Sequence, residues 1–310
     1  LAAAYPPGAK KLRDSLTKPQ QAEMAIELAG FEQKHEPGLA KSRVPALMEI
    51  LRDSTGKRNW QERGPAIDLL SELPLDAGQQ SAFESLLLAE LKNPRRDDVA
   101  MSALGHVVPA LARLPEPDRH WNALVSADKN ADGFGEIDQL IDTLAELALA
   151  KPDPRMRDFA RFLKPRFSRC KGLMDDLFLT ALALDLRELA PDIARLASSG
   201  PEVADGEGAH SWSGGFTGPG NQRYHTARHV TAIWLEPDAD TRAMLWAGLL
   251  VKQPYEFRGD SAIAGALRDR FRGALQSASK ETSVRALRFV RASTSRERNP
   301  IDWLDDDANR

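Results

Sequence analysis

The chain of 310 residues is long enough for two domains or for one elongated array of repeats. Hydrophobic residues make up 42% and charged residues 28%, a balance that is typical of a folded protein and excludes a disordered one. The formal net charge of −3 provides no global attraction to nucleic acid or to an anionic membrane. No uninterrupted apolar run approaches roughly 18 residues, so a membrane-spanning segment is excluded.

The cysteine content and the first residues of the chain bear on the cellular compartment in which the protein is expected. Cys170 is the single cysteine, which excludes an internal disulfide framework and a cysteine-based zinc site. A reducing compartment fits this best, and we expect a cytoplasmic protein of bacterial type, although a periplasmic protein without disulfides has the same composition. The chain begins Leu-Ala-Ala-Ala-Tyr-Pro-Pro-Gly, without Met or a signal-peptide pattern, which resembles a processed terminus. A signal peptide removed earlier would leave no trace here.

Helical periodicity recurs along the chain, whereas β-strand signals are nearly absent. In the first part, apolar residues three or four positions apart predict helices near 19–31, 44–51, 65–73, 76–91 and 97–108, separated by short turns with Pro, Gly or Asp. The same spacing predicts further helices near 155–163, 173–184, 186–196, 224–235, 240–251, 262–275 and 283–290. The sequence therefore predicts an all-α protein.

Parts of the chain resemble one another. The segment Gly64–Leu73 aligns with Asp98–Val107, about 34 residues further on, and Asp240–Leu250 has a similar composition. A repeat of this length built from two helices is typical of an α-solenoid, in which stacked antiparallel helix pairs bury the faces that one pair alone leaves exposed. A plain helical bundle with fortuitous spacing is the alternative.

A turn followed by Asp-Val-x-x-x-Ala-Leu-Gly occurs at Asp98–Gly105 and, more weakly, elsewhere. On this pattern, residues 20–295 resemble the HEAT/armadillo-like helical-repeat superfamily. The resemblance implies a right-handed stack of roughly six or seven helix pairs and no particular chemistry, because such families share only an architecture. The expected organisation is an N-terminal arm, helical repeats, a Gly-rich loop insertion, further helical repeats and an acidic tail, at residues 1–18, 19–199, 200–223, 224–295 and 296–310.

The Gly-rich loop is the most unusual stretch of the chain. Between Gly200 and Gly220 it contains seven glycines and two aromatic residues. A long loop of this kind is either functional or disordered, and glycine and charge favour disorder as much as the aromatics favour a docked recognition loop. We expect the concave face of the solenoid and the stretch 200–235 to bind a protein or peptide partner. Because Trp, Tyr and Arg dominate binding hot spots, the expected contacts are Trp212, Phe216, Arg223, Tyr224, Arg228 and Trp234.

Nucleic acid is the second candidate partner. Arg285, Arg288 and Arg291 occupy successive turns of one predicted helical face, a spacing that suits contacts to phosphates. A solvated helix face is the ordinary explanation of such a charge run.

Metal-dependent catalysis is the third candidate. His225 and His229 are four residues apart and share one face of a predicted helix, as a two-histidine metal site requires, and His210 could add a ligand. Thr226 stands where a metalloprotease has Glu after the first His, and the charge of Arg228 would repel a divalent ion.

A short segment resembles an EF-hand calcium loop. Its ligand positions are Asp128, Asn130, Asp132, Phe134, Glu136 and Gln139, with Gly133 at the sharp turn. Gln139 replaces the expected bidentate Glu, which would weaken binding. An inter-helix turn rich in Asp, Asn and Gly is the alternative.

No catalytic triad or carboxylate pair stands out, so we expect a non-enzymatic recognition scaffold. No cofactor is expected other than Ca²⁺ at this segment.

Overall fold

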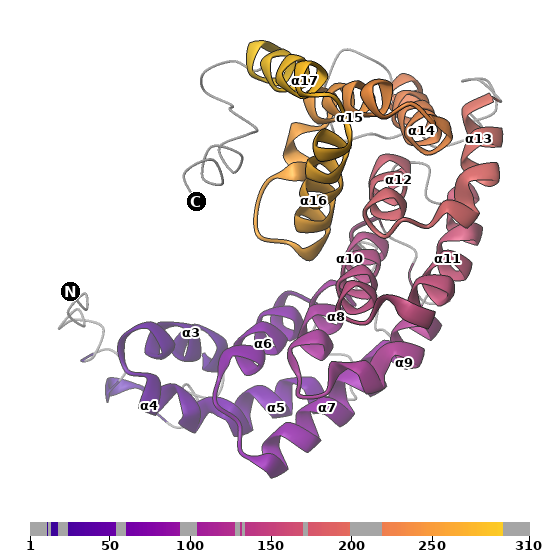
Figure 1. The fold of residues 1–310 in the computed structure, drawn as a ribbon. Helices are drawn as coiled ribbons and strands as arrows, with labels where there is room; N and C mark the ends of the chain where they lie inside the picture. The colour runs from indigo at the N-terminus through magenta and orange to yellow at the C-terminus, as the bar shows by residue number, and fades with distance from the viewer. Residues whose placement is uncertain are drawn as a thin grey trace. The chain divides into compact units, whose positions relative to one another are not determined.

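The computed structural model describes residues 24–53, 60–93, 104–127, 134–169, 173–198 and 219–293, together with residues 11, 14–17 and 131 (Figure 1). Within these ranges every regular element is an α-helix or a short 3-10 helix, and none is a strand. The predicted all-α class is therefore confirmed. Contacts divide the chain into two compact units, Leu1–Thr143 and Leu144–Arg310, which are described separately.

Unit 1 consists of helices of 4 to 16 residues and the first part of a helix that crosses the unit boundary. In chain order they are α3 (Ala25–His35), α4 (Pro37–Ala40), α5 (Val44–Arg52), α6 (Trp60–Glu72), α7 (Ala77–Lys92), α8 (Leu104–Arg113), α9 (Trp121–Ser126) and α10 (Phe134–Ala150), with 3-10 turns at Lys41–Arg43 and Pro117–His120. The start of α7 follows from local chemistry. The Asp76 carboxylate accepts the Gln79 N–H at 2.8 Å and the Gln79 side chain accepts the Asp76 N–H, which forms a capping box.

Helices of unit 1 pack against neighbours that are two places away in the chain as well as against adjacent ones. Helix α6 packs against α3, α5 and α8, and α7 packs against α5, α8 and α9. The apolar faces meet at Leu47, Ile67, Leu70 and Phe83, each at most 1% exposed. Burial of such side chains contributes about 1.5–3 kcal/mol each and holds the helices together.

Polar contacts join the same neighbouring helices at their edges. The Gln33 amide of α3 donates to the Glu72 carboxylate of α6 at 2.7 Å. His106 Nδ1 of α8 lies 2.9 Å from an Asp68 carboxylate oxygen of α6. Helix α6 is therefore hydrogen-bonded both to α3, which precedes it in the chain, and to α8, which follows it.

Unit 2 contains the rest of α10 and the helices that follow. These are α11 (Pro152–Arg169), α12 (Met174–Ala183), α13 (Ala190–Ser198), α14 (Pro219–Leu235), α15 (Ala239–Lys252), α16 (Ala262–Ser277) and α17 (Lys280–Ser293), with 3-10 turns at Arg187–Leu189 and Pro254–Phe257. Helix α14 packs against α12, α13 and α15, and α15 packs against α16 and α17. Trp246 and Phe257, with ring centroids 6.3 Å apart in an edge-to-face arrangement, lie in the core of this unit.

Helix α14 begins earlier than its periodicity predicts. Its first residue is Pro219, so residues 219–223, which the sequence assigns to the Gly-rich loop, are helical. Proline suits the first turn of a helix because its fixed φ is helical and its missing N–H would have no helical partner there. Residues 200–218 lie outside the described residues.

Candidate functional site

A cleft of about 580 Å³ opens within unit 2 between α12, α14, α15 and α16. Its apolar lining includes Leu182, Ile233 and Trp246. Its charged lining includes three arginines, Arg187, Arg242 and Arg270, one from the turn after α12 and one each from α15 and α16. Concave sites with an apolar floor and a few convergent polar groups are the usual form of a ligand site.

Trp234 brings a polar group to this cleft. It follows directly after Ile233, which is buried with Ala227 and Val230 on the inner face of α14, so the indole lies at the edge of that face. The indole N–H is buried, and the residues that the structure describes offer it no hydrogen-bond acceptor. An unsatisfied buried donor costs about 1–3 kcal/mol, which a ligand oxygen would offset.

Arg270 is held at the cleft by the end of α12. Its Nε donates to the Ala183 carbonyl at 2.8 Å, and a guanidinium nitrogen lies 3.6 Å from an Asp185 carboxylate oxygen. Burial lowers the pKa of Arg270, an effect that Asp185 opposes and the nearby Arg187 reinforces. Positive charge has thus been brought into a partly desolvated position, where an anion interacts with it more strongly than in water.

Asp185 has an unusual backbone conformation. Its φ of 55° is left-handed, a region that costs a non-glycine residue about 1–2 kcal/mol. The Leu186 N–H bonds to the Ala181 carbonyl and the Asp185 N–H to the Leu182 carbonyl, the arrangement of a Schellman helix end in which glycine is usual. Here aspartate takes this position, and its carboxylate accepts from Arg187 Nε at 3.0 Å.

The charges of the cleft do not balance. Asp269, the second carboxylate of the lining, is paired with Arg272 at 2.7 Å. Arg242 donates to a neutral group, the Glu236 carbonyl, at 2.8 Å. Arg187 and Arg270 contact the remaining carboxylate, Asp185. Hydrogen bonds from Thr241 lower the pKa of Asp238, and Arg242 adds to this effect, so Arg242 also has a carboxylate near it. The lining itself comprises three arginines and two carboxylates, an excess of one positive charge.

Of the residues predicted to bind a partner, the structure brings Trp234 to the cleft. Arg228 is exposed on α14 and is not part of the lining. Arg223 and Tyr224 belong to α14, but their side chains are outside the described residues, as are Trp212 and Phe216. Arg187, Arg242 and Arg270 are not predicted from the sequence, because they are scattered in the chain and follow no motif.

The predicted metal ligands are only partly described. His229 is half-buried on α14, and its Cε1 lies 3.6 Å from where a Cβ would stand at Gly248, so the ring packs against α15. His210 and the side chain of His225 are outside the described residues. Across the ranges that the structure covers, no three His, Cys, Asp or Glu residues are grouped so that they could hold a metal ion.

The calcium-loop prediction is also untested at its first ligands, because Asp128, Asn130 and Asp132 lie outside the described residues. Helix α10 begins at Phe134, so its positions from Phe134 to Gln139 are helical. In a calcium loop the backbone carbonyl of the seventh position is a ligand, whereas in a helix that carbonyl accepts the N–H four residues later. Glu136 is buried and Gln139 is half-buried.

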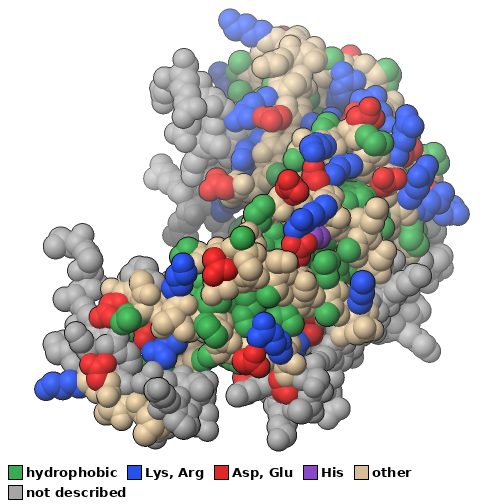
Figure 2. Space-filling view, turned by 90° about the horizontal axis from the view of Figure 1, so that it is seen from below, with side chains coloured by type: hydrophobic (Ala, Val, Ile, Leu, Met, Phe, Trp, Pro, Cys, Tyr) green, Lys and Arg blue, Asp and Glu red, His purple; other side chains and the backbone are tan. Residues whose placement is uncertain are grey.

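The predicted nucleic-acid residues Arg285, Arg288 and Arg291 are all exposed on α17. Phe289 is 41% exposed beside them. On the face of the molecule displayed in Figure 2, basic and acidic side chains are interspersed, and no extended surface of one sign is visible there. The nucleic-acid alternative stays a prediction.

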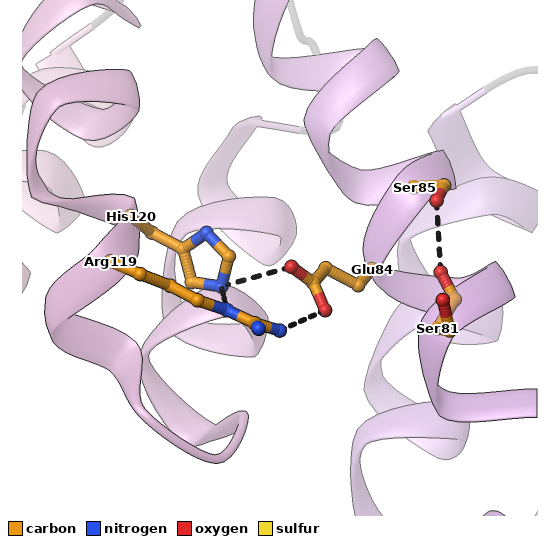
Figure 3. Close-up of polar contacts among 5 residues, drawn as sticks. All are labelled: Ser81, Glu84, Ser85, Arg119 and His120. Atoms are coloured by element: carbon orange, nitrogen blue, oxygen red, sulfur yellow. Dashed lines mark hydrogen bonds and ion pairs between the residues drawn. The ribbon is translucent and has the colours of Figure 1, made fainter. Parts of the chain in front are cut away.

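A second polar cluster lies in unit 1, where α7 meets the turn before α9 (Figure 3). His120 is buried, with Nε2 at 3.6 Å from a Glu84 carboxylate oxygen and 3.4 Å from Arg119 Nε, and Arg119 also pairs with Glu84. Burial lowers the pKa of His120, Glu84 raises it and Arg119 lowers it further.

The serines beside this cluster do not extend it into a catalytic arrangement. The Ser85 hydroxyl donates to the Ser81 carbonyl at 2.9 Å, within α7, rather than to the imidazole (Figure 3). A nucleophile would need a hydrogen bond to the histidine base. The cluster joins two helices and has the character of a structural contact.

Comparison with protein-family models, with curated proteins and with solved structures found no match for this chain. The site must therefore be interpreted from its own geometry. None of the helices in the described ranges has both the length and the hydropathy to cross a membrane.

Proposed function

We propose that this chain is a helical-repeat recognition protein of the HEAT-like type, without enzymatic activity, that holds a peptide segment of a partner protein in the cleft of unit 2. The repeat interpretation is supported by the spacing of contacts between neighbouring helices. Gln33 bonds to Glu72, 39 residues away, and His106 to Asp68, 38 residues away. In unit 2, Ser279 bonds to Asp240, again 39 residues away.

A nearly constant separation of this kind is what an array of helix pairs requires. Each repeat contacts only the next one, so equivalent edges of successive helices meet at intervals of one repeat length. The intervals are somewhat longer than the 34 residues of the sequence alignment and lie just below the HEAT range of about 40–47 residues.

The observation that carries the functional proposal is the buried indole N–H of Trp234 at a cleft that also presents three arginines. Tryptophan and arginine are the residues most enriched in binding hot spots. Within the described lining there is no His, Cys or Lys, both carboxylates are paired with arginines, and the Ser277 hydroxyl donates to the Gly273 carbonyl. These groups favour binding over acid–base or nucleophilic chemistry.

The test is a selection from a random peptide library displayed on phage, followed by affinity measurement with the enriched peptide. Gly273→Leu should block the cleft, because Gly273 lines it and a Cβ there meets open space. We expect this variant to lose at least about tenfold in affinity, or 1.4 kcal/mol.

Gly265→Leu is the matched control, since Gly265 is on the same helix, tolerates a Cβ and is outside the lining. It should bind as the unaltered protein does. An enriched peptide that binds Gly273→Leu with full affinity, or a selection that yields no peptide, contradicts the proposal.

A further inference from the structure

The cleft also has features that define the chemistry of its ligand. We propose that it selects a segment rich in Asp or Glu, whose carboxylates are received by Arg187, Arg242 and Arg270, and that Asp185 occupies part of this anion site when no ligand is bound. This inference rests on the proposed function, because it assumes that the cleft binds a peptide.

The charge of the lining favours an anion. Three arginines line the cleft with two carboxylates, of which Asp185 contacts Arg187 and Arg270 and Asp269 is paired with Arg272. A peptide carboxylate beside Arg242 would meet a guanidinium that donates a hydrogen bond to the neutral Glu236 carbonyl. A carboxylate adds the Coulomb attraction of opposite charges to its hydrogen bonds with a guanidinium, and a neutral amide lacks this attraction, so the site favours an anion.

The polar groups of the cleft are mainly hydrogen-bond donors. The indole N–H of Trp234 is a donor without an acceptor among the described residues, and a guanidinium offers only donors. A ligand must therefore supply acceptors. Carboxylate oxygens supply them, whereas a basic peptide would bring further donors and like charge.

The backbone conformation of Asp185 also bears on the ligand. A left-handed position at a helix end would be less strained with glycine, yet the aspartate places its carboxylate 3.0 Å from Arg187 and 3.6 Å from Arg270. It keeps two guanidinium groups of like charge close together in the absence of ligand. An incoming carboxylate would take over the same partners, so Asp185 competes with the ligand.

The apolar part of the lining distinguishes an acidic peptide from a nucleic-acid backbone. Leu182, Ile233 and Trp246 lie in the same cleft as the arginines. A peptide can place an aliphatic side chain on this surface beside its carboxylate, whereas the large apolar surface that a nucleic acid offers is the flat face of a base. The net charge of −3 also disfavours a polyanion that contacts the rest of the surface.

The experiment uses fluorescence anisotropy with a labelled peptide of Glu, Leu and Trp, a matched peptide in which each Glu is replaced by Gln, and a single-stranded oligonucleotide. We expect the Glu peptide to bind at least about tenfold more tightly than the Gln peptide and the oligonucleotide. Arg187→Gln, at an exposed arginine, should weaken binding of the Glu peptide about three- to tenfold.

Asp185→Gly and Asp185→Asn should instead tighten it by a similar factor, because both residues tolerate the left-handed conformation and neither carries the competing charge. Arg195→Gln is the matched control. It removes an equally exposed arginine that is paired with Asp192 on α13, outside the cleft, and should leave the affinity unchanged.

The outcomes separate this inference from the proposed function. If the library selection yields peptides that Gly273→Leu excludes but the Gln peptide binds as well as the Glu peptide, the acidic preference is wrong and the recognition cleft stands. Tighter binding of the oligonucleotide, or weaker binding by both Asp185 variants, overturns the acidic-peptide assignment. Failure of both the selection and the direct titration rejects the cleft as a peptide site.

Discussion

Gly64 of α6 and His106 of α8 lie so close together that a Cβ at position 64 would stand 2.5 Å from Cδ2 and Nε2 of the imidazole. The ring is turned so that its Nδ1 faces Asp68, one turn further along α6. Because position 64 has no Cβ, the His106 ring of α8 can lie directly against α6, and its hydrogen bond with Asp68 holds it there.

Gly64→Ala should therefore not give the stabilisation that alanine usually gives in a helix. The same change at Gly105 of α8, where a Cβ meets nothing within 4 Å, should raise the free energy of unfolding by about 0.5–1 kcal/mol. At Gly64 the ring must move from Asp68, and Pro65 further disfavours a Cβ in the helical region. We expect Gly64→Ala to be at or below the stability of the unaltered protein in urea titrations.

A double-mutant cycle tests the cause. In the His106→Ala background the collision is absent, so Gly64→Ala should cost less than it does beside His106. Equal costs in the two backgrounds would show that the imidazole does not limit position 64.

The buried His120 predicts a loss of stability at mildly acidic pH. Burial lowers the pKa of His120 in the folded protein below its value of 6.5 in the unfolded chain. The unfolded state therefore binds more protons between these two pKa values, and the free energy of unfolding rises with pH in that window. The contribution is present above pH 6.5 and is lost as the pH falls toward the folded-state pKa.

Denaturant titrations at about pH 7.5 and about pH 5.5 measure this effect. The difference between the two pH values should shrink in His120→Asn, which cannot titrate. Glu84→Gln should enlarge it, because Glu84 opposes the lowering of the His120 pKa. A pH dependence that is the same with and without His120 would contradict the assignment.

Arg63 and Glu90 form a buried ion pair between α6 and α7. Their side chains are 4% and 7% exposed, and Arg63 also donates to the carbonyls of Ile50 and Leu51 at the end of α5. Glu90→Leu leaves the guanidinium buried without its counter-charge and should cost about 3–5 kcal/mol of unfolding free energy.

The double variant Arg63→Met with Glu90→Leu should recover only part of this loss. It removes the buried charge but leaves the carbonyls of Ile50 and Leu51 without this donor. Glu49→Leu breaks the exposed pair with Arg52 and serves as the control, with an expected change within about 0.5 kcal/mol. A comparable loss in the control and in Glu90→Leu would show that burial of the pair is unimportant.

The Asp240 side chain of α15 is hydrogen-bonded to the start of α17. Its carboxylate accepts the Ser279 N–H at 2.6 Å, the Ser279 hydroxyl at 2.8 Å and the Thr282 hydroxyl at 2.9 Å. These hydrogen bonds, that of the Ser279 N–H first, lower the pKa of Asp240. Asp240→Ala should lower the melting temperature, whereas Asp260→Ala, at an exposed residue before α16, should not.

The direction in which the stabilisation by Asp240 changes with pH follows from the lowered pKa of its carboxyl. The unfolded carboxyl binds its proton first as the pH falls below 3.8, so the stabilisation by Asp240 is present above that pH and is lost below it. Asp240→Ala and the unaltered protein should therefore differ less in melting temperature at pH 3 than at neutral pH. A difference that grows with acidity would contradict this role.

Much of the fold follows from the sequence alone. Helical periodicity and local capping decide where most helices lie, because an amphipathic stripe and a side chain that accepts a first-turn N–H are properties of a few consecutive residues. Asp76, Asp238 and Ser261 each cap the helix that follows them. Helices α6 and α14 are exceptions, since α6 begins at Trp60, before the Pro65 that the sequence places at its start, and α14 begins in a stretch whose glycines suggest a loop.

The cleft, in contrast, depends on which helix faces meet. Arg270 bonds to the Ala183 carbonyl, 87 residues away, and Trp234 reaches the same cleft from a third helix. Within its own helix each of these residues follows the usual pattern. Arg270 occupies a charged position, and Trp234 lies beside the buried face. Only the packing of α12, α14, α15 and α16 determines that these side chains converge, because the apolar faces fix the helix positions and the polar residues at their edges follow. Sequence periodicity determines the helices of this protein, and tertiary packing determines its site.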